Sequence, residues 1–212
     1  MSETYFVPCA GAESEFTEKR SRFIGRVQRV ENEAEARAYI DAVKKKHYDA
    51  RHNCWCYIVH EGGVVRYGDD GEPQGTAGQP MLNVFQREGV ENVVCVVTRY
   101  FGGVLLGAGG LTRAYAKSAK DALDAAGKAR MTLWTRLRVS VPYPLLDRLT
   151  RLLDAHGGVA EDSGYGADVS VTLRLPSERA KAFAAALTEL SNGGVAPEPL
   201  GTVFLPGRRE DG

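Results

Sequence analysis

A chain of 212 residues, with 43% apolar and 25% charged side chains, has room for one or two domains and the composition of a globular protein. Its 27 Lys and Arg residues balance 27 Asp and Glu residues, which excludes a globally basic protein, so a surface for nucleic acid has to be a local patch. The lack of a long apolar run and of a signal pattern predicts a cytoplasmic protein with no membrane partner, and four irregularly spaced cysteines exclude a disulfide framework.

The sequence pattern of the first 130 residues predicts a domain of mixed strands and helices. An arginine-rich strand over residues 23–30 leads to a helix, which Asn32 and Glu35 begin as a capping box. A hairpin is predicted over residues 54–67. The densest positive stretches of the chain are Lys19, Arg20, Arg22, Arg26 and Arg29, together with the run of three lysines at residues 44–46. Either these cations bind the phosphate groups of RNA, or they are the ordinary solvent-exposed face of a strand and of a helix end.

A long polar loop follows the hairpin and carries several carboxylates among glycines. Its Asp70 and Glu72 can hold Mg²⁺ near a phosphate, or they belong to a solvated turn. A loop of this length in a compact domain favours a functional role. His52 is the one nearby candidate for a general base. Although His52, Cys54 and Cys56 share one face of a strand, no fourth ligand completes a zinc site, and we expect no metal ligands and no cofactor.

A second glycine-rich loop follows an apolar run at residues 93–97, which predicts a buried strand. Its glycines are Gly102, Gly103, Gly107, Gly109 and Gly110. Arg99 and Arg113 lie on either side, and a helix is predicted from Leu111 to Ala126. The free N–H groups of the helix start and the two guanidinium groups favour a phosphate or a carboxylate. Neither the P-loop nor the dinucleotide-binding pattern is complete, so a tight loop that only lets the helix pack on the sheet is the alternative.

The sequence predicts a second domain over residues 134–206. A linker within residues 127–134 is expected to join it to the first domain, residues 1–130. Strand and helix periodicities follow one another in the order β-α-β-β-α-β. This order is typical of the ferredoxin-like fold, so the whole chain is assigned to the α+β class. Exposed faces and edges of such a sheet predict that protein partners bind this domain.

Four motifs make the chain resemble the YigZ/IMPACT family. They are Lys19-Arg-Ser-Arg-Phe23, His52-Asn-Cys-Trp-Cys56, Asp69-Asp-Gly-Glu-Pro-Gln-Gly-Thr-Ala-Gly78 and Thr98-Arg-Tyr-Phe-Gly-Gly-Val-Leu-Leu-Gly-Ala-Gly-Gly-Leu-Thr-Arg-Ala-Tyr115. The resemblance implies that the first domain is an α/β sandwich like the second domain of ribosomal small-subunit protein five. It also implies that the second domain is similar to the last domain of elongation factor G. The chain departs from the family pattern at Cys56, where a small residue such as alanine is usual.

The resemblance implies a role in translation control, because eukaryotic relatives bind an activator of the amino-acid-starvation kinase. Those relatives carry a different extra domain, so that partner is not transferred to this chain. We predict a non-enzymatic protein that binds RNA or the ribosome through phosphate contacts of the Gly102–Gly110 loop and regulates translation. The alternative is an enzyme or binder that acts on a nucleotide or small phosphorylated metabolite with Mg²⁺. A proline dipeptidase is not supported, because a two-metal peptidase needs several separated Asp, Glu and His ligands.

Overall fold

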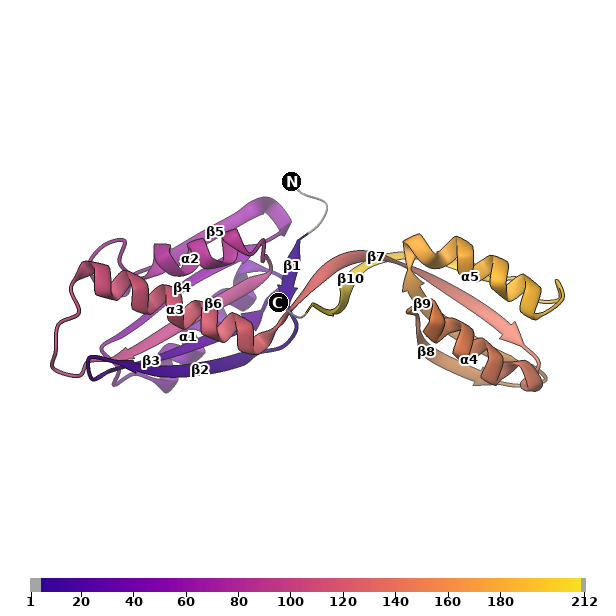
Figure 1. Ribbon diagram of the computed structural model, residues 1–212, viewed down its shortest axis with the longest axis horizontal. Helices are drawn as coiled ribbons and strands as arrows, with labels where there is room; N and C mark the ends of the chain where they lie inside the picture. Colours follow the sequence, from indigo (N-terminus) through magenta and orange to yellow (C-terminus); the bar gives the residue numbers. More distant parts are fainter. Residues whose placement is uncertain (1–4, 211–212) are drawn as a thin grey trace. The chain divides into compact units, whose positions relative to one another are not determined.

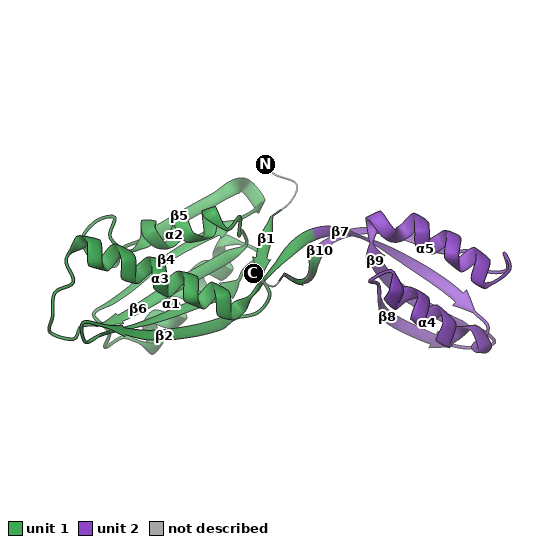
Figure 2. Ribbon diagram, viewed as in Figure 1, with its two compact units in different colours: residues 1–131, 206–212 green, residues 132–205 purple. Residues whose placement is uncertain are grey.

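The computed structural model describes residues 5–210, and the chain divides into two compact units (Figure 2). Unit 1 extends to residue 131 and also takes in the chain from residue 206 onward, whereas unit 2 comprises residues 132–205. Both units combine helices with a sheet (Figure 1). The predicted α+β class and the presence of two domains are therefore confirmed.

Unit 1 is built on a five-stranded sheet in which every neighbouring pair of strands runs antiparallel. In sheet order the strands are β2 (Ala12–Glu18), β3 (Ser21–Arg29), β6 (Val93–Tyr100), β4 (His52–Val59) and β5 (Val64–Gly68). The short 3-10 turn η1 (Glu61–Gly63) joins β4 to β5. The central strand β6 is buried along nearly its whole length, because helices cover it on both sides, and this explains its continuous apolar sequence.

Helices cover both faces of this sheet. They are α1 (Glu33–Lys46), α2 (Gly78–Arg87) and α3 (Ala108–Ala126). On one face, Ile40 of α1 packs with Val96 of β6 in a small core. On the other face, Phe85 of α2 and Ala119 of α3 pack with Phe23 of β3 in a larger core. The α/β sandwich predicted for the first domain is therefore confirmed.

Unit 2 has the predicted ferredoxin-like order. Its elements are β7 (Lys128–Val141), η2 (Tyr143–Leu145), α4 (Leu146–Ala155), β8 (Val159–Tyr165), β9 (Val169–Pro176), α5 (Ser177–Leu190) and β10 (Glu198–Glu210). The strands are arranged in the order β10, β7, β9, β8. Leu153 of α4 and Phe183 of α5 pack on Val139 and Leu173 of the sheet, so both helices cover one face. The ferredoxin-like prediction is confirmed.

The boundary between the two units, after residue 131, lies within the segment predicted to be a linker, residues 127–134, but the segment consists of Gly127, which caps α3, and the first half of β7. It is a strand because β1 (Phe6–Pro8) pairs with it, with Phe6 opposite Arg130. Neither β1 nor β2 was predicted from the sequence. β1 has only three residues, and β2 is an edge strand with no fully buried residue, whose sequence carries three glutamates and a single large apolar residue, Phe16.

Candidate functional site

The candidate site lies at the end of the unit 1 sheet where β6 finishes and both of its neighbours begin. Antiparallel pairing brings these three ends together, and Arg99 stands directly opposite Phe23 of β3 on one side and His52 of β4 on the other. Residues in one cross-strand row point to the same face of a sheet. The side chains of Arg99 and His52 therefore share the face that α2 and α3 cover.

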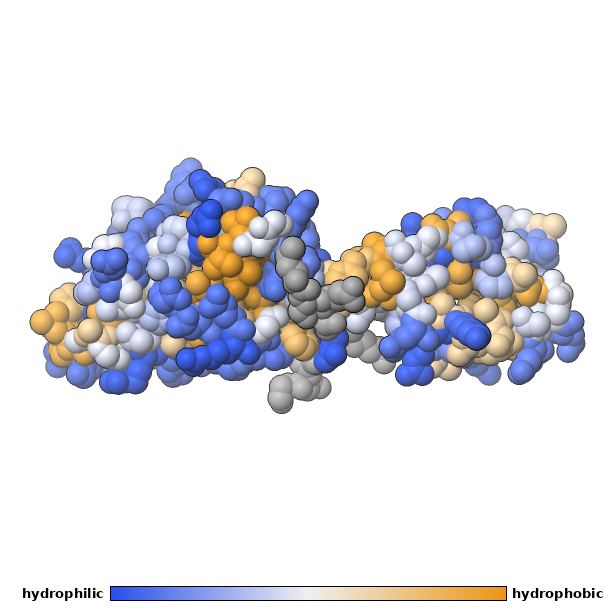
Figure 3. All heavy atoms as spheres, turned by 90° about the horizontal axis from the view of Figure 1, so that it is seen from above, coloured by the Kyte–Doolittle hydropathy of each residue, from blue (hydrophilic) through white to orange (hydrophobic). Residues whose placement is uncertain are grey.

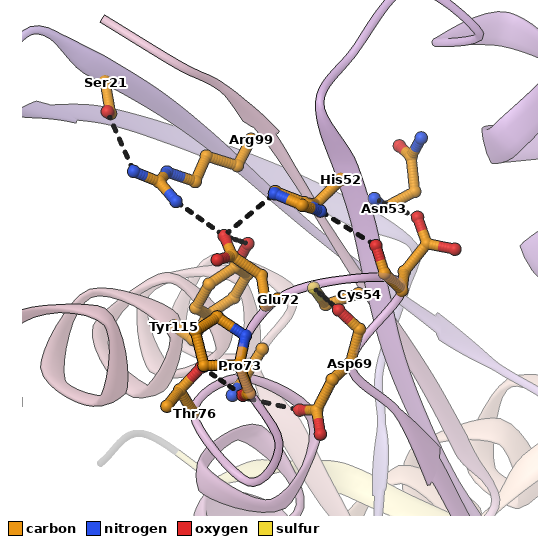
Figure 4. A network of polar contacts seen from close by, with 12 residues as sticks. Ser21, His52, Asn53, Cys54, Asp69, Glu72, Pro73, Thr76, Arg99 and Tyr115 are labelled. Carbon is orange, nitrogen blue, oxygen red and sulfur yellow. Dashed lines mark hydrogen bonds and ion pairs between the residues drawn. The ribbon is translucent and has the colours of Figure 1, made fainter. Parts of the chain in front are cut away.

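A buried carboxylate, Glu72, is the centre of the polar network drawn in Figure 4. Arg99 Nη1 donates to Glu72 Oε1 at 2.7 Å, and the Tyr115 hydroxyl donates to the same oxygen at 2.8 Å. The side chains of Arg99 and Glu72 are only 6% and 3% exposed. Arg99 Nη2 also donates to Ser21 Oγ at 3.4 Å, and Ser21 Oγ accepts the Gly102 N–H at 3.2 Å. The network thus fixes the loop that carries Asp69, Asp70 and Glu72, here called the acidic loop, to β6. It also fixes it to the start of the Gly102–Gly110 loop, here called the glycine loop.

His52 is held in one tautomer at the edge of this network. Its Nδ1 lies 2.8 Å from the backbone oxygen of Asp70, and since a carbonyl only accepts, Nδ1 carries a proton. Its Nε2 lies 3.8 Å from Glu72 Oε1. The His52 ring therefore bridges the two positions of the acidic loop that the sequence singled out.

The carboxylates of the acidic loop face three different places. Asp69 accepts backbone N–H groups from Gly75, Ala77 and Gly78 at 2.8, 3.1 and 2.8 Å, and so occupies the N-terminus of α2. Asp70 instead pairs with Lys44 Nζ at 2.6 Å and accepts the Asn53 N–H at 2.7 Å. Within residues 5–210, no three His, Cys, Asp or Glu side chains gather as metal ligands would. Asp70 and Glu72, which the Mg²⁺ alternative requires, engage separate protein partners.

The cysteines on β4 are packed thiols. Cys54 donates to the Asp69 backbone oxygen at 2.9 Å, and burial raises the pKa of its thiol well above the ordinary value. Burial likewise raises the pKa of Cys56, which lies directly opposite Cys95 in the sheet. Burial, with Cys54 and Glu72 nearby, also raises the pKa of the Tyr115 phenol. Cys54 and Tyr115 therefore stay protonated and act as hydrogen-bond donors.

The glycine loop lies against the hairpin turn between β2 and β3 (Figure 1, left end). A Cβ at Gly102 would be 2.0 Å from the backbone oxygen of Arg20, so only glycine allows this approach. Gly107, with φ +73°, precedes the first residue of α3 and offers no side-chain cap. Gly103 lies in the loop, and Gly109 and Gly110 form the first turn of α3.

The β2–β3 turn itself consists of two cationic residues in an unfavourable conformation. Glu18 pairs with Ser21, so Lys19 and Arg20 alone form the turn, with φ values of 44° and 65°. Two-residue hairpin turns with positive φ at both positions favour Asn-Gly. A left-handed conformation costs a residue with a side chain about 1–2 kcal/mol. The sequence did not reveal this turn, because recognising it requires β2 to be identified first.

A small pocket of about 150 Å³ opens between this turn and α3. It is lined by Phe16, Glu18, Lys19, Leu106, Gly110, Arg113, Ala114 and Lys117. Lys117 pairs with Asp121, whereas the side chains of Lys19, Arg20 and Arg113 form no ion pair or hydrogen bond with any residue in the described range 5–210. We refer to these three residues as the cation cluster. Arg99 is thus engaged by Glu72, while Arg113 lines the pocket with Lys19.

Across residues 5–210, no helix combines the length and the apolar character needed to cross a membrane.

Comparisons with known proteins find relatives along most of the chain. Residues 19–123 match the Impact N-terminal domain, and residues 139–193 match a domain of unknown function, DUF1949. The chain is 37% identical over 194 residues to the IMPACT family member YvyE of Bacillus subtilis, covering 91% of this chain and 89% of YvyE. It is 34% identical to the IMPACT family member YigZ of Escherichia coli, covering 90% of this chain and 95% of YigZ. A crystal structure of a protein described as hypothetical is 32% identical, with a TM-score of 0.60 and coverage of 95% of this chain and 99% of that one.

Proposed function

The chain belongs to the IMPACT family, and from this premise we propose that it is a non-enzymatic cytoplasmic protein that associates with RNA or the ribosome and regulates translation. Phosphate groups bind at the cation cluster, beside the Gly102–Gly110 loop. The observation that carries this proposal is a gathering at one end of unit 1 of three cations whose side chains have no partner within residues 5–210, in a chain whose formal net charge is zero. Such a local patch is what a phosphate backbone recognises.

The conformation of the β2–β3 turn supports a role for its charges. Lys19 and Arg20 occupy positions at which the hairpin alone favours asparagine and glycine. Strained backbone positions occur preferentially at functional sites, where the side chain is needed for something other than stability. The charge of the turn is therefore retained despite an energetic cost.

The start of α3 adds a further attraction for an anion. The N–H groups of its first turn have no side-chain cap, and the turn holds no acidic residue. A helix of this length contributes the equivalent of about half a positive charge at its N-terminus. The N-terminus of α2, by contrast, is already occupied by the carboxylate of Asp69.

The partners of the acidic loop weigh against the Mg²⁺-dependent alternative. Asp70 is paired with Lys44, and Glu72 is buried against Arg99. A hard cation needs several oxygen ligands directed at one point. Burial also keeps the Cys54 thiol neutral, which removes the most evident nucleophile.

The test is a double substitution of the turn, Lys19→Asn with Arg20→Gly, compared with the wild type in ribosome co-sedimentation and RNA binding over a salt series. Each phosphate contact contributes about 0.7–0.9 to the slope of log K against log salt, so the slope should fall by about 1.5. A matched control, Arg87→Gln with Lys181→Gln, removes two exposed charges elsewhere and should leave the slope unchanged. Absence of any association by the wild type, or an unchanged slope in the turn variant, would overturn the proposal.

A further inference from the structure

The loop beside the cation cluster exposes apolar side chains. Between β6 and α3, Phe101 is 47% exposed, Val104 38% and Leu105 81%. In Figure 3 hydrophobic surface is visible at the same end of unit 1, among hydrophilic residues. Single exposed apolar residues are ordinary on a protein surface, but three within five positions indicate a contact surface.

The Phe101 ring lies against the guanidinium group of Arg99, which is held in place by an ion pair. The Arg99 guanidinium carbon lies 5.5 Å from the centre of the Phe101 ring and 5.6 Å from that of Phe23, so the guanidinium is close to two aromatic side chains. Arg99 cannot turn away, because its buried head is bonded to Glu72. One side of the Phe101 ring is thus engaged by the protein, and about half of the side chain remains open to a ligand.

The apolar loop and the cation cluster form one continuous surface. Gly102, the residue after Phe101, packs against the backbone of Arg20 so closely that no side chain fits between them. At the other end of the loop, Leu106 lines the same pocket as Lys19 and Arg113. An aromatic ring next to unpartnered cations is the combination that proteins use for single-stranded nucleic acid, in which bases stack on the ring and phosphates meet the cations.

We infer that the loop from Phe101 to Leu105 is a stacking surface for unpaired bases, and that the ligand at this surface is single-stranded RNA. The inference rests on the proposed function and adds the class of ligand. A duplex keeps its base faces stacked inside, so it offers only phosphates and groove edges to such a loop. An acidic peptide or an anionic membrane would match the charge, but neither requires an aromatic ring positioned over a buried guanidinium.

The test separates stacking from general apolar contact. Binding of a labelled single-stranded RNA and of its duplex is measured at fixed salt for the wild type, Phe101→Leu and Phe101→Trp. Leucine keeps most of the apolar area but has no π face, so single-strand affinity should fall roughly 5- to 150-fold for one lost base stack. Duplex affinity should not change, and tryptophan should restore single-strand binding. Thermal unfolding of the free proteins is the control for intact folding.

The outcomes distinguish failure of the inference from failure of the proposed function. If the wild type binds neither RNA form and does not co-sediment with ribosomes, the proposed function itself fails, whereas co-sedimentation without binding of either RNA form overturns the stacking inference alone. If the wild type binds RNA but Phe101→Leu binds both forms equally well, or loses both to the same extent, only the stacking inference is overturned. Binding of the wild type to an acidic peptide or to phosphatidylserine vesicles, lost in Phe101→Leu while single-strand affinity is unchanged, would likewise overturn it and indicate the other class of partner.

Discussion

The acidic loop that precedes α2 and the glycine loop that precedes α3 look alike in sequence but differ in how their polar groups are used. Both are rich in glycine, and each leads into a helix. In the acidic loop, Asp69, Asp70 and Glu72 are all bonded to other parts of unit 1. Beside the glycine loop, the cation cluster and the start of α3 have no such partners within the described residues. The difference assigns the first loop to the fold, and it leaves the second loop available for the ligand that the proposed function requires.

The largest effect expected from this comparison is the loss of stability in Glu72→Ala. The substitution leaves Arg99 buried and without its counter-ion, and breaking a buried pair in this way costs about 3–5 kcal/mol. The free energy of unfolding measured by urea titration checks this. Glu72→Gln, which keeps two polar atoms at the same place, should lose less. If Glu72→Ala unfolds at the wild-type urea concentration, the acidic loop is not structural and the comparison fails.

Asp69→Ala should have the next largest effect. It removes the acceptor of three backbone N–H groups at the N-terminus of α2, and the loss of such a cap costs about 2 kcal/mol. Asp69→Asn keeps an acceptor oxygen and should recover part of the loss. The urea midpoints of the two variants provide the measurement, and an effect on RNA affinity at constant folding would contradict a purely structural role.

Substitutions in the β2–β3 turn, beside the glycine loop, should increase the free energy of unfolding instead of decreasing it. Lys19→Asn with Arg20→Gly places the favoured residues at two left-handed positions. The relief of backbone strain, reduced by the greater freedom of glycine in the unfolded chain, should stabilise the protein by about 1 kcal/mol. Thermal and urea unfolding check this without any ligand. Destabilisation by the pair would show that these side chains serve the fold, which removes the distinction between the two loops.

The motifs and both domain folds were predictable from the sequence, but the partners of the site residues were not. The predicted β-α-β-β-α-β order was confirmed, because strand and helix periodicities depend on neighbouring residues. Arg99 was grouped with Arg113 because both lie beside the glycine loop in the chain. Its ion pair is instead with Glu72, 27 positions away, and depends on the cross-strand row that β3, β6 and β4 form. No local pattern encodes that row.

The same limit applied to the β2–β3 turn. β2 places glutamate and serine on an edge strand, so its alternation does not resemble a half-buried strand. Lys19 and Arg20 therefore read as part of a basic stretch rather than as a hairpin turn. The sequence does indicate the turn once β2 is aligned antiparallel to β3, because Phe16 then lies opposite Phe23 and only two residues remain between the strands.

The smallest expected effect is a change in the pH dependence of stability. It tests whether His47 anchors the end of β6 on the face of the sheet that α1 covers. Arg26 Nη2 lies 2.8 Å from His47 Nε2, so this nitrogen must accept, and Nδ1 is then left to donate to the Tyr100 hydroxyl at 2.9 Å. Burial, together with Arg26 and Lys46, lowers the pKa of His47 below 6.5. The tautomer of His47 is thus set by a guanidinium that cannot give up its proton.

The sign of the pH effect follows from this lowered pKa. Well above pH 6.5 the imidazole is neutral in both the folded and unfolded states, and there His47 has no effect on the pH dependence. As the pH falls through 6.5, the unfolded state takes up the proton first, so stability decreases until the lower pKa of the folded state is passed. The slope should be gentle, because His47 is partly exposed and water screens its charge. Urea unfolding from pH 7.5 to 5 should show a smaller decrease for His47→Gln than for the wild type. Equal decreases would mean that protonation of His47 is not coupled to folding, and that its hydrogen bond to Tyr100 does not hold the end of β6 in place.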